Sequence, residues 1–422
     1  MPELLQAVKG MNDLLPPDSA KWRRIEDAAR TAFERHGYAE ARTPIVEYTP
    51  LFVRSIGDAT DVVEKEMYTF ADRDEKSLTL RPEGTASCVR AYLEHSVHKK
   101  EPVTRWYYAG PMFRHERAQR GRYRQFYQMG CEALGVGEPT VEAEQIAMLH
   151  ELFTGLGLTA LEVVVNSVGG PDDRPAYRAA LVAYFTPHKA ELCEDCQRRL
   201  ERNPLRILDC KVEGCHRLAA AAPTMSQYLG AASREHFAAF REALEALGVA
   251  HTVDERLVRG LDYYTGTIYE LRAQTGDLGA QNTVAGGGRY DNLIEEMGGP
   301  ATPAVGFALG VERLVISIPG EVESYVPPTD VFLVGHGKPA RLACLATAKD
   351  LRKLGLRVEL EHRAASMKAQ LKRADRLRAR AVIIVGEDEL ARGEVVVRDM
   401  GKGEQLKVPA GDVASAIKGI LG

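Results

Sequence analysis

The chain has 422 residues, of which 45% are hydrophobic and 27% charged, and its formal net charge is −4. These values are typical of globular proteins, and the length predicts two or three domains. They exclude a chain that binds nucleic acid through overall positive charge, so any such contact must come from local basic patches. Because no apolar run could cross a bilayer and the N-terminus has no signal-peptide pattern, we expect a cytoplasmic protein without a membrane partner.

The first fifty residues predict a helix followed by an interrupted strand. Apolar residues recur at helical spacing over residues 18–37, with charged residues on the opposite side. Residues 40–48 have the composition of a strand, but Pro44 lies inside it. Because proline has no N–H to donate to a neighbouring strand, this strand suits a sheet edge or an interface.

A short strand at 78–80 and a helix over 86–98 flank the sequence RPEGT. In this segment Glu83 and Thr85 lie on either side of Gly84. A carboxylate and a hydroxyl at a helix start can bind a ligand ammonium group, and a capped helix start explains them equally well.

Residues 107–135 predict two antiparallel strands joined by a polar, basic loop at 117–123. If Glu116 pairs with Arg124, then Arg114, Gln128 and Glu132 share one face, because side chains alternate along a strand.

Two glycines of this hairpin, Gly110 and Gly130, would leave room beside that face. A cation, an amide and a carboxylate above two glycines indicate a ligand-binding surface. An amphipathic hairpin with a solvated polar face is an equal alternative, since polar alternation is common on half-exposed sheets.

The middle of the chain predicts a helix over 140–156, a strand over 162–168 and a mostly helical insertion over 171–250. Seven cysteines, an odd number, argue against a disulfide framework. Four of them cluster in the insertion, as Cys193-x2-Cys196 and Cys210-x4-Cys215. This spacing is similar to that of zinc ligands, although the second pair is looser than usual. Reduced thiols in a helical segment are the alternative.

Glycine-rich segments follow the insertion. In LVRGLDYYTGTIYE, over 257–270, Arg259 precedes Gly260, which allows close backbone approach while the guanidinium reaches an anion. GGGRYD, over 286–291, and the segment 303–313 come next. The latter leads into a helix whose first turn holds Arg313, and a helix start favours phosphate. Neither a P-loop nor a dinucleotide-binding fingerprint is present in the sequence.

A proline- and glycine-containing linker over 317–330 precedes a change of pattern. Short apolar strands at 331–334, 357–360 and 382–385 alternate with helical stretches, which predicts an α/β domain with parallel strands. The basic helical stretch 367–380 is compatible with RNA contact or with a solvated helix face.

Taken in order, these segments resemble the class II aminoacyl-tRNA synthetases. The strand around Pro44 is similar to their dimer-interface motif, residues 113–116 with the returning strand to their second motif, and residues 306–313 to their third. LVRGLDYYTGTIYE, GGGRYD, RPEGT and KGMNDLLPPD resemble the signatures of the histidyl-tRNA synthetases. The resemblance covers essentially the whole chain.

The resemblance implies an α+β catalytic domain with an antiparallel sheet flanked by helices, formed by residues 1–170 and 251–322. A mostly helical insertion over 171–250 and a C-terminal α/β anticodon-binding domain over 329–422 complete the expected organisation. It also implies a homodimer that ligates L-histidine to histidine tRNA with ATP and Mg²⁺, through a histidyl-adenylate.

Residue roles follow from the same resemblance. Arg114 and Arg259 would be catalytic, contacting the α-phosphate of ATP and the histidine carboxylate. ATP would also contact Glu116 and Arg313. The remaining histidine-binding residues would be Glu83, Thr85 and Gln128 at the amino group, Glu132 and Tyr264 at the imidazole, and Tyr263. Gln119 and Arg120 would contact the tRNA acceptor stem.

Three other functions are alternatives to this one. A catalytically silent, synthetase-like regulatory subunit of histidine biosynthesis should lack the Arg259 motif, the insertion or the C-terminal domain. A synthetase for threonine or proline should differ in the segment 257–264. A generic RNA-binding α/β protein leaves the arginine-lined hairpin and the glycine-rich segments unexplained.

Overall fold

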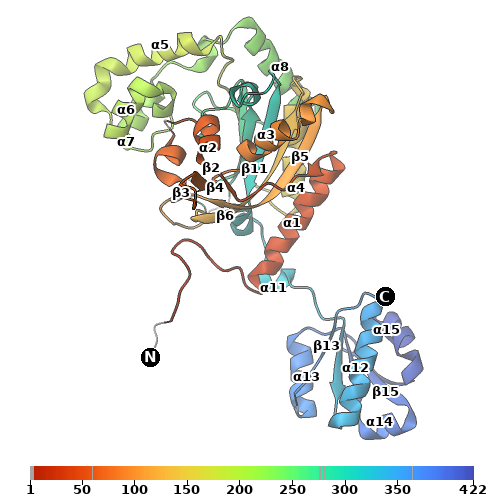
Figure 1. Ribbon diagram of the computed structural model, residues 1–422. Coiled ribbons are helices and arrows are strands. Elements are labelled where there is room, and N and C mark those ends of the chain that lie inside the picture. The colour runs from red at the N-terminus through yellow and green to blue at the C-terminus, as the bar shows by residue number, and fades with distance from the viewer. Residues whose placement is uncertain (1–3, 59, 275–277, 279–281, 364) are drawn as a thin grey trace. The chain divides into compact units, whose positions relative to one another are not determined.

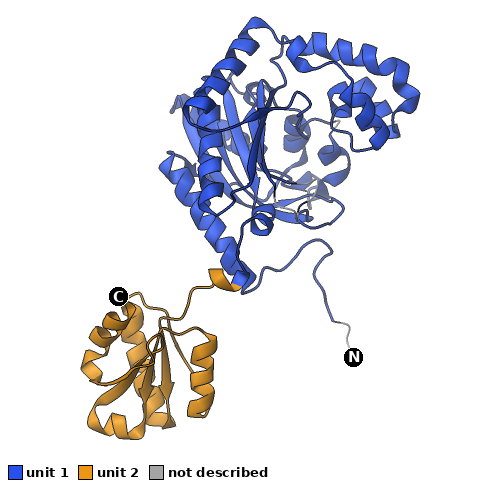
Figure 2. Ribbon diagram, turned by 180° about the vertical axis from the view of Figure 1, so that it is seen from behind, with its two compact units in different colours: residues 1–322 blue, residues 323–422 orange. Residues whose placement is uncertain are grey.

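The computed structural model describes residues 4–58, 60–274, 278, 282–363 and 365–422. The chain divides into two compact units, residues 1–322 and 323–422, which Figure 2 colours separately. Each unit has its own buried apolar core. Among the described residues, no helix combines the length and the apolar character that a membrane crossing requires.

Unit 1 is organised around an eight-stranded sheet (Figure 1). In spatial order its strands are β1 (Ala39–Glu40), β5 (Thr104–Phe113), β6 (Gln125–Leu134), β11 (Ala304–Gly310), β10 (Thr283–Arg289), β9 (Thr267–Ala273), β7 (Leu161–Ser167) and β8 (Thr252–Val253). All neighbours are antiparallel except at the two edges, where β1 and β8 run parallel to β5 and β7. The expected antiparallel sheet is therefore confirmed.

Helices cover this sheet on both faces. α1 (Asp18–Arg35) and α4 (Thr140–Gly155) pack together, and α4 lies against β10 and β11. On the other face α3 (Thr85–Glu94) packs against β6, while α9 (Leu293–Glu296) lies beside α2 (Thr49–Ile56) and α3. α10 (Val311–Ser317) follows β11 directly. Odd-numbered aromatic residues such as Tyr107, Tyr269 and Phe307 are buried, and even-numbered polar residues of β6 and β9 face the opposite side.

The β5–β6 hairpin forms where it was predicted, but its register differs from the expected one. Arg124 accepts the backbone N–H of Arg114 at 2.9 Å, so Arg114 takes the place expected for Glu116. The shift is two residues, which preserves the alternation of faces. Gln128 and Glu132 therefore still lie on one face.

The expected room at the hairpin glycines is taken by other side chains. A Cβ at Gly110 would lie 2.4 Å from Arg81 Nη2, and one at Gly130 would lie 2.5 Å from the ring of Tyr108. These glycines therefore allow tight packing beneath the site.

Pro44 separates two strands that belong to different sheets. β1 joins the main sheet, and β2 (Val46–Tyr48) pairs with β4 (Ser77–Leu80) in a three-stranded sheet completed by β3 (Tyr68–Ala71). A π-helical turn, Val62–Glu66, follows α2.

The segment 171–250 is helical, as predicted. It contains α5 (Arg174–Phe185), α6 (Glu194–Arg202), α7 (Glu213–Ala220) and α8 (Ala231–Ala246), and α5 to α7 form the yellow-green group in Figure 1. Short 3₁₀ turns at Thr186–Glu191, Pro204–Ile207 and Met225–Gln227 connect these helices. A separate cluster of buried apolar residues holds α5, α6 and α7 together.

Unit 2 contains a five-stranded sheet with helices. Its strands are ordered β13 (Val358–Leu360), β12 (Val331–Gly335), β14 (Ala381–Val385), β15 (Glu394–Asp399) and β16 (Gln405–Pro409). The first three are parallel, as predicted, and the last two add antiparallel pairs that sequence analysis missed. The helices are α12 (Gly337–Lys353), α13 (Met367–Arg376), α14 (Glu387–Arg392) and α15 (Val413–Leu421). The short helix α11 (Val322–Tyr325) lies within the expected linker.

Candidate active site

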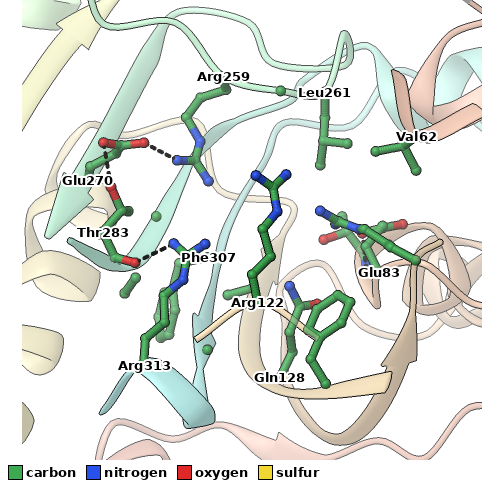
Figure 3. Close-up of a pocket in the computed structure, with 18 of the residues that line it drawn as sticks. Val62, Glu83, Arg122, Gln128, Arg259, Leu261, Glu270, Thr283, Phe307 and Arg313 are labelled. Carbon is green, nitrogen blue, oxygen red and sulfur yellow. Dashed lines mark hydrogen bonds and ion pairs between the residues drawn. The ribbon is translucent and has the colours of Figure 1, made fainter. Parts of the chain in front are cut away.

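A cavity of about 370 Å³ lies over the strands β6, β10 and β11 of unit 1. Its walls come from the hairpin, the start of α3, the segment after the insertion and the start of α10. Figure 3 shows Arg122, Arg259 and Arg313 reaching into the same space, with Glu83 and Gln128 on its other side. Four segments that are far apart in the sequence therefore meet in one site.

One half of the cavity is strongly cationic. Arg114, Arg122, Arg259 and Arg313 all line it. Burial, together with the positive charges of the other three arginines, lowers the pKa of Arg313 to about 10. Arg313 also donates to the backbone oxygens of Gly121 at 3.3 Å and Thr283 at 2.7 Å, which hold its side chain in place. A bound polyanion would relieve the mutual repulsion of these guanidinium groups.

Arg259 is held by Glu270 of strand β9. Its Nη1 donates to Glu270 Oε1 at 2.5 Å, and its guanidinium lies 5.9 Å from the ring centroid of Tyr264. Burial opposes the charge, yet Tyr264 and Glu270 raise the pKa of Arg259, so it stays protonated. A Cβ at Gly286 would approach Arg259 to 2.6 Å, so the glycine triplet makes room for this guanidinium.

Arg114 and Glu116 follow the end of β5. Arg114 Nε donates to Pro82 O at 2.9 Å, and its guanidinium lies 5.3 Å from the ring centroid of Phe126. Burial lowers the pKa of Arg114. Glu116 forms an ion pair with Arg122 and lies 3.9 Å from Arg114 Nη1. A carboxylate thus separates two of the cavity arginines.

The other half of the cavity carries acceptors at the start of α3 and on β6. The Glu83 carboxylate accepts the backbone N–H groups of Thr85 at 2.7 Å and Ala86 at 2.8 Å, so it caps α3. The capped helix start is therefore present, and Glu83 also lines the cavity. Gln128 lines it too, and its buried Oε1 has no hydrogen-bond partner within the described part of the chain. Such an acceptor is suited to a ligand donor.

Glu132 lies beneath this half and is fully buried. It accepts a hydrogen bond from Thr85 Oγ1 at 2.7 Å and another from the hydroxyl of Tyr290. Burial raises the pKa of Glu132 to about 8, although both hydroxyls oppose the shift. Gly306 packs directly on this carboxylate. Thr85 and Tyr290, which do line the cavity, connect Glu132 to it.

Several cavity residues were not identified from the sequence. Glu270 and Tyr290 belong to the glycine-rich segments 257–270 and 286–291. The sequence therefore indicated these segments as part of a site, but not these two side chains. Arg206, Asp209 and Lys211 come from the insertion, and only tertiary packing brings them to the cavity. Arg206 donates to Gly260 O at 2.6 Å and to Asp262 Oδ1 at 3.0 Å.

Comparison with known proteins identifies the family. The family model for histidyl-tRNA synthetase matches residues 10–314, and the model for an anticodon binding domain matches residues 330–420. The chain belongs to the histidyl-tRNA synthetase family.

Relatives named histidine–tRNA ligase match this chain over almost their whole length. The histidine–tRNA ligase of Syntrophotalea carbinolica is 48% identical over 98% of both chains. That of Sorangium cellulosum is 50% identical over 96% of this chain and 94% of its own. The crystal structure of apo histidyl-tRNA synthetase from S. aureus is 37% identical, covers 98% of this chain and 100% of its own, and has a TM-score of 0.83.

The family signatures thus converge in space. Of the expected site residues, those that line the cavity are Glu83, Thr85, Arg114, Glu116, Gln128, Arg259, Tyr263, Tyr264 and Arg313. Glu132 lies below it. Gln119 and Arg120 lie in the exposed loop of the hairpin, outside the cavity lining. The four clustered cysteines lie together in the insertion and are also outside the lining.

Proposed function

We propose that this chain ligates L-histidine to its tRNA, first forming histidyl-adenylate and pyrophosphate from ATP and then releasing AMP. The observation that carries the proposal is the division of one cavity into a half with four arginines and a half with Glu83, Gln128 and the buried Glu132. The first half suits the two anions that must react, and the second suits a small polar amino acid. Membership of the histidyl-tRNA synthetase family supports the same conclusion.

In the first step a histidine carboxylate oxygen attacks the α-phosphorus of ATP. A bond forms between that oxygen and phosphorus, and the bond to pyrophosphate breaks. Negative charge accumulates on the α-phosphoryl oxygens, and fixed guanidinium groups stabilise it without reorganising. We assign this role to Arg114 and Arg259, because their backbone, aromatic and carboxylate contacts hold them in place.

Recognition of histidine is assigned to the second half. The acceptors Glu83 and Gln128, with Thr85, would bind the α-amino group. Glu132 and Tyr264 would bind the imidazole, and Tyr263 would pack beside it. A pocket with buried polar groups rejects amino acids that leave those groups unpaired. Histidine specificity would therefore depend on Glu132, acting in concert with its neighbours Thr85 and Tyr290.

ATP would occupy the arginine-lined half, with Arg313 at the phosphates and adenine face and Glu116 at the adenine end. Mg²⁺ would bind with its phosphates, where it would neutralise charge on pyrophosphate. We assign Glu312 to this ion, because it lines the cavity and the backbone N–H of Tyr127, donating to its Oε1 at 2.8 Å, holds the carboxylate in place. Its carboxylate oxygens are the ligand type that Mg²⁺ prefers.

Transfer to tRNA would use surfaces outside the cavity. The exposed loop with Gln119 and Arg120 is assigned to the acceptor stem, and unit 2, which matches the anticodon-binding model, to the anticodon region. A catalytically silent regulatory subunit is not favoured. The chain has Arg114, Arg259 and Arg313 in one cavity, and it retains both the insertion and the C-terminal unit.

Amino-acid-dependent ATP–pyrophosphate exchange, measured across the standard amino acids, tests the proposed function. We expect exchange with histidine only. A second assay measures transfer of histidine to a transcript of its tRNA. Exchange with another amino acid would indicate a different synthetase. Absence of exchange together with tight histidine binding would favour the regulatory subunit.

We also propose a homodimer that uses the small sheet β2–β4–β3. Tyr48 and Phe70 on this sheet are 56% and 46% exposed, and Ile45, just before β2, is 42% exposed, although all three are apolar or aromatic. Exposed apolar groups of this kind are typical of interaction surfaces. Tyr48→Asp should shift the protein toward monomer in sedimentation velocity, and Leu406→Asp, at an exposed apolar position of unit 2, should not. Equal behaviour of the two variants would contradict this interface.

A further inference from the structure

The insertion brings four thiols together away from the cavity. Their Sγ atoms all lie within 4.8 Å of one another, and they belong to Cys193, Cys196, Cys210 and Cys215. We call these residues the cysteine cluster. We propose that the cysteine cluster binds one structural zinc ion.

The spacing of the sulfur atoms suits a single tetrahedral ion. With zinc–sulfur bonds of about 2.3 Å, tetrahedral geometry places sulfur atoms about 3.8 Å apart. The Sγ atoms of Cys193 and Cys210 lie 3.9 Å apart, and none of the six separations exceeds 4.8 Å. Four thiolates are the ligand set that structural zinc sites use most readily.

Two helix starts present the thiols to a common point. Cys193 immediately precedes α6 and Cys196 lies in its first turn. Cys210 and Cys215 bracket the start of α7. The backbone N–H of Cys193 donates to Cys215 Sγ at 3.2 Å. Backbone N–H groups and helix starts favour the thiolate form that a metal requires.

Two other uses of the cluster fit less well. All four cysteines are free, and the 3.9 Å between the Sγ atoms of Cys193 and Cys210 is far longer than the roughly 2.05 Å of a disulfide bond. An iron–sulfur cluster with several iron atoms holds its ligands farther apart than a single ion does. A mononuclear ion therefore suits the observed separations better.

The position of the cluster explains why an ion would stabilise this region. Three of its cysteines are buried within the apolar core shared by α5, α6 and α7. α6 and α7 have only nine and eight residues, and helices of this length are marginal without tertiary support. A metal ion that joins the starts of both helices would supply that support.

The cluster is also connected to the candidate active site. Arg199 of α6 donates to Arg206 O at 3.4 Å and to Asp61 Oδ2 at 2.7 Å. Arg206 in turn binds Gly260 and Asp262, next to Arg259. Loss of the ion should therefore loosen the segment that borders Arg259. An effect of this loosening on activity rests on the proposed function, whereas the metal site itself does not.

Metal analysis of the full chain tests the proposal. Protein purified without a metal-affinity tag or chelator should contain about one zinc ion per chain by mass spectrometry. Cys196→Ser and Cys210→Ser should each lose it. Cys344→Ala, a buried free cysteine of unit 2, is the matched control and should retain it. Cobalt substitution should give the intense visible absorption of tetrahedral thiolate coordination.

A measurement on the wild-type protein keeps the proposal testable if the cysteine variants do not fold. A mercurial reagent should release the zinc as the cysteine cluster is modified, and the insertion should become more sensitive to limited proteolysis. The proposal is overturned if the protein has only trace zinc and binds none under reducing conditions. It is also overturned if iron occupies the site, or if folded Cys196→Ser and Cys210→Ser variants both keep their zinc. None of these outcomes depends on the ligase activity.

Discussion

At the scale of single residues, the candidate site depends on charges that the protein holds in place before substrates bind. Arg259 illustrates this, because Glu270 and Tyr264 fix its guanidinium while its backbone lies in a loop. A fixed cation stabilises charge that develops in a transition state more than charge already present in the substrate.

Arg259→His should therefore impair chemistry more than binding. We expect the rate of histidine-dependent ATP–pyrophosphate exchange to fall by about a hundredfold or more, since a preorganised donor is worth about 2.7–4 kcal/mol. The dissociation constant for histidine, measured by calorimetry, should change by only a few-fold. Arg241→His, an exposed position of α8 outside the cavity lining, is the control. Equal losses in rate and binding would contradict the assignment.

Glu132 makes stability depend on pH. Its pKa is raised by burial to about 8, whereas a glutamate in an unfolded chain titrates near about 4.3. Between these values the folded protein binds more protons than the unfolded chain. The stabilising contribution of Glu132 to the free energy of unfolding is therefore fully present below about pH 4, and it is lost as the pH rises through about 8.

Glu132→Gln should remove this loss. We expect urea unfolding to show a smaller decrease in stability from about pH 5 to about pH 8 in the variant than in the wild type. Glu235→Gln, an exposed position on α8, should retain the wild-type slope. Identical slopes for Glu132→Gln and the wild type would show that Glu132 does not titrate in this range.

At the scale of elements, the insertion borders the cavity as well as packing on itself. Arg206, in the 3₁₀ turn after α6, binds the loop that carries Arg259. Ion pairs from α6 add a second contact: Arg199 binds Asp61, just before the π-helical turn, and Arg202 binds Glu64 within it. The insertion thus holds two walls of the cavity.

Arg206→Ala should lower kcat/KM for histidine activation by about tenfold or more. A hydrogen bond from a charged group contributes roughly 1.5–3 kcal/mol, and Arg206 makes two to this loop. Exchange kinetics would measure the change. Arg217→Ala, which removes an exposed arginine of α7, should leave kcat/KM unchanged. Similar kinetics in both variants would mean that the insertion does not position the Arg259 loop.

At the scale of the whole molecule, the candidate active site and the anticodon-binding match lie in different units. Every residue of the candidate active site lies in unit 1, while unit 2 carries the anticodon-binding match. On α13 of unit 2, Lys368, Lys372 and Arg376 are exposed and four residues apart, so they share one helix face.

Replacing these three residues by alanine should weaken tRNA binding without affecting histidine activation. Each lost phosphate contact lowers affinity and reduces its dependence on salt. We expect a raised KM for tRNA with a shallower salt dependence, and unchanged ATP–pyrophosphate exchange.

The control for that variant removes the same charge elsewhere in unit 2, at the exposed Lys402, Lys407 and Lys418. Its KM for tRNA should stay near that of the wild type. If both triple variants behave alike, the α13 face is a solvated surface and net charge explains the effect.

The sequence by itself determined the family, the order of most elements and most of the expected side chains that line the cavity. Its signals were local: the alternation of the hairpin, the glycines of 286–288 and the helical spacing of the insertion. It also placed Arg114, Gln128 and Glu132 on one face, because an even register shift preserves alternation.

Only the tertiary structure decided which side chains fill the space beside each glycine and what lies next to the cavity. Tyr108 and Arg81 occupy the room at Gly130 and Gly110, and Arg259 occupies that at Gly286. Arg206 reaches the site, and the cysteine cluster gathers, through contacts between segments that no periodicity encodes. Local patterns specify helices and the faces of strands. Which side chains from distant segments meet at one point depends on long-range packing, and this exists only in the folded chain.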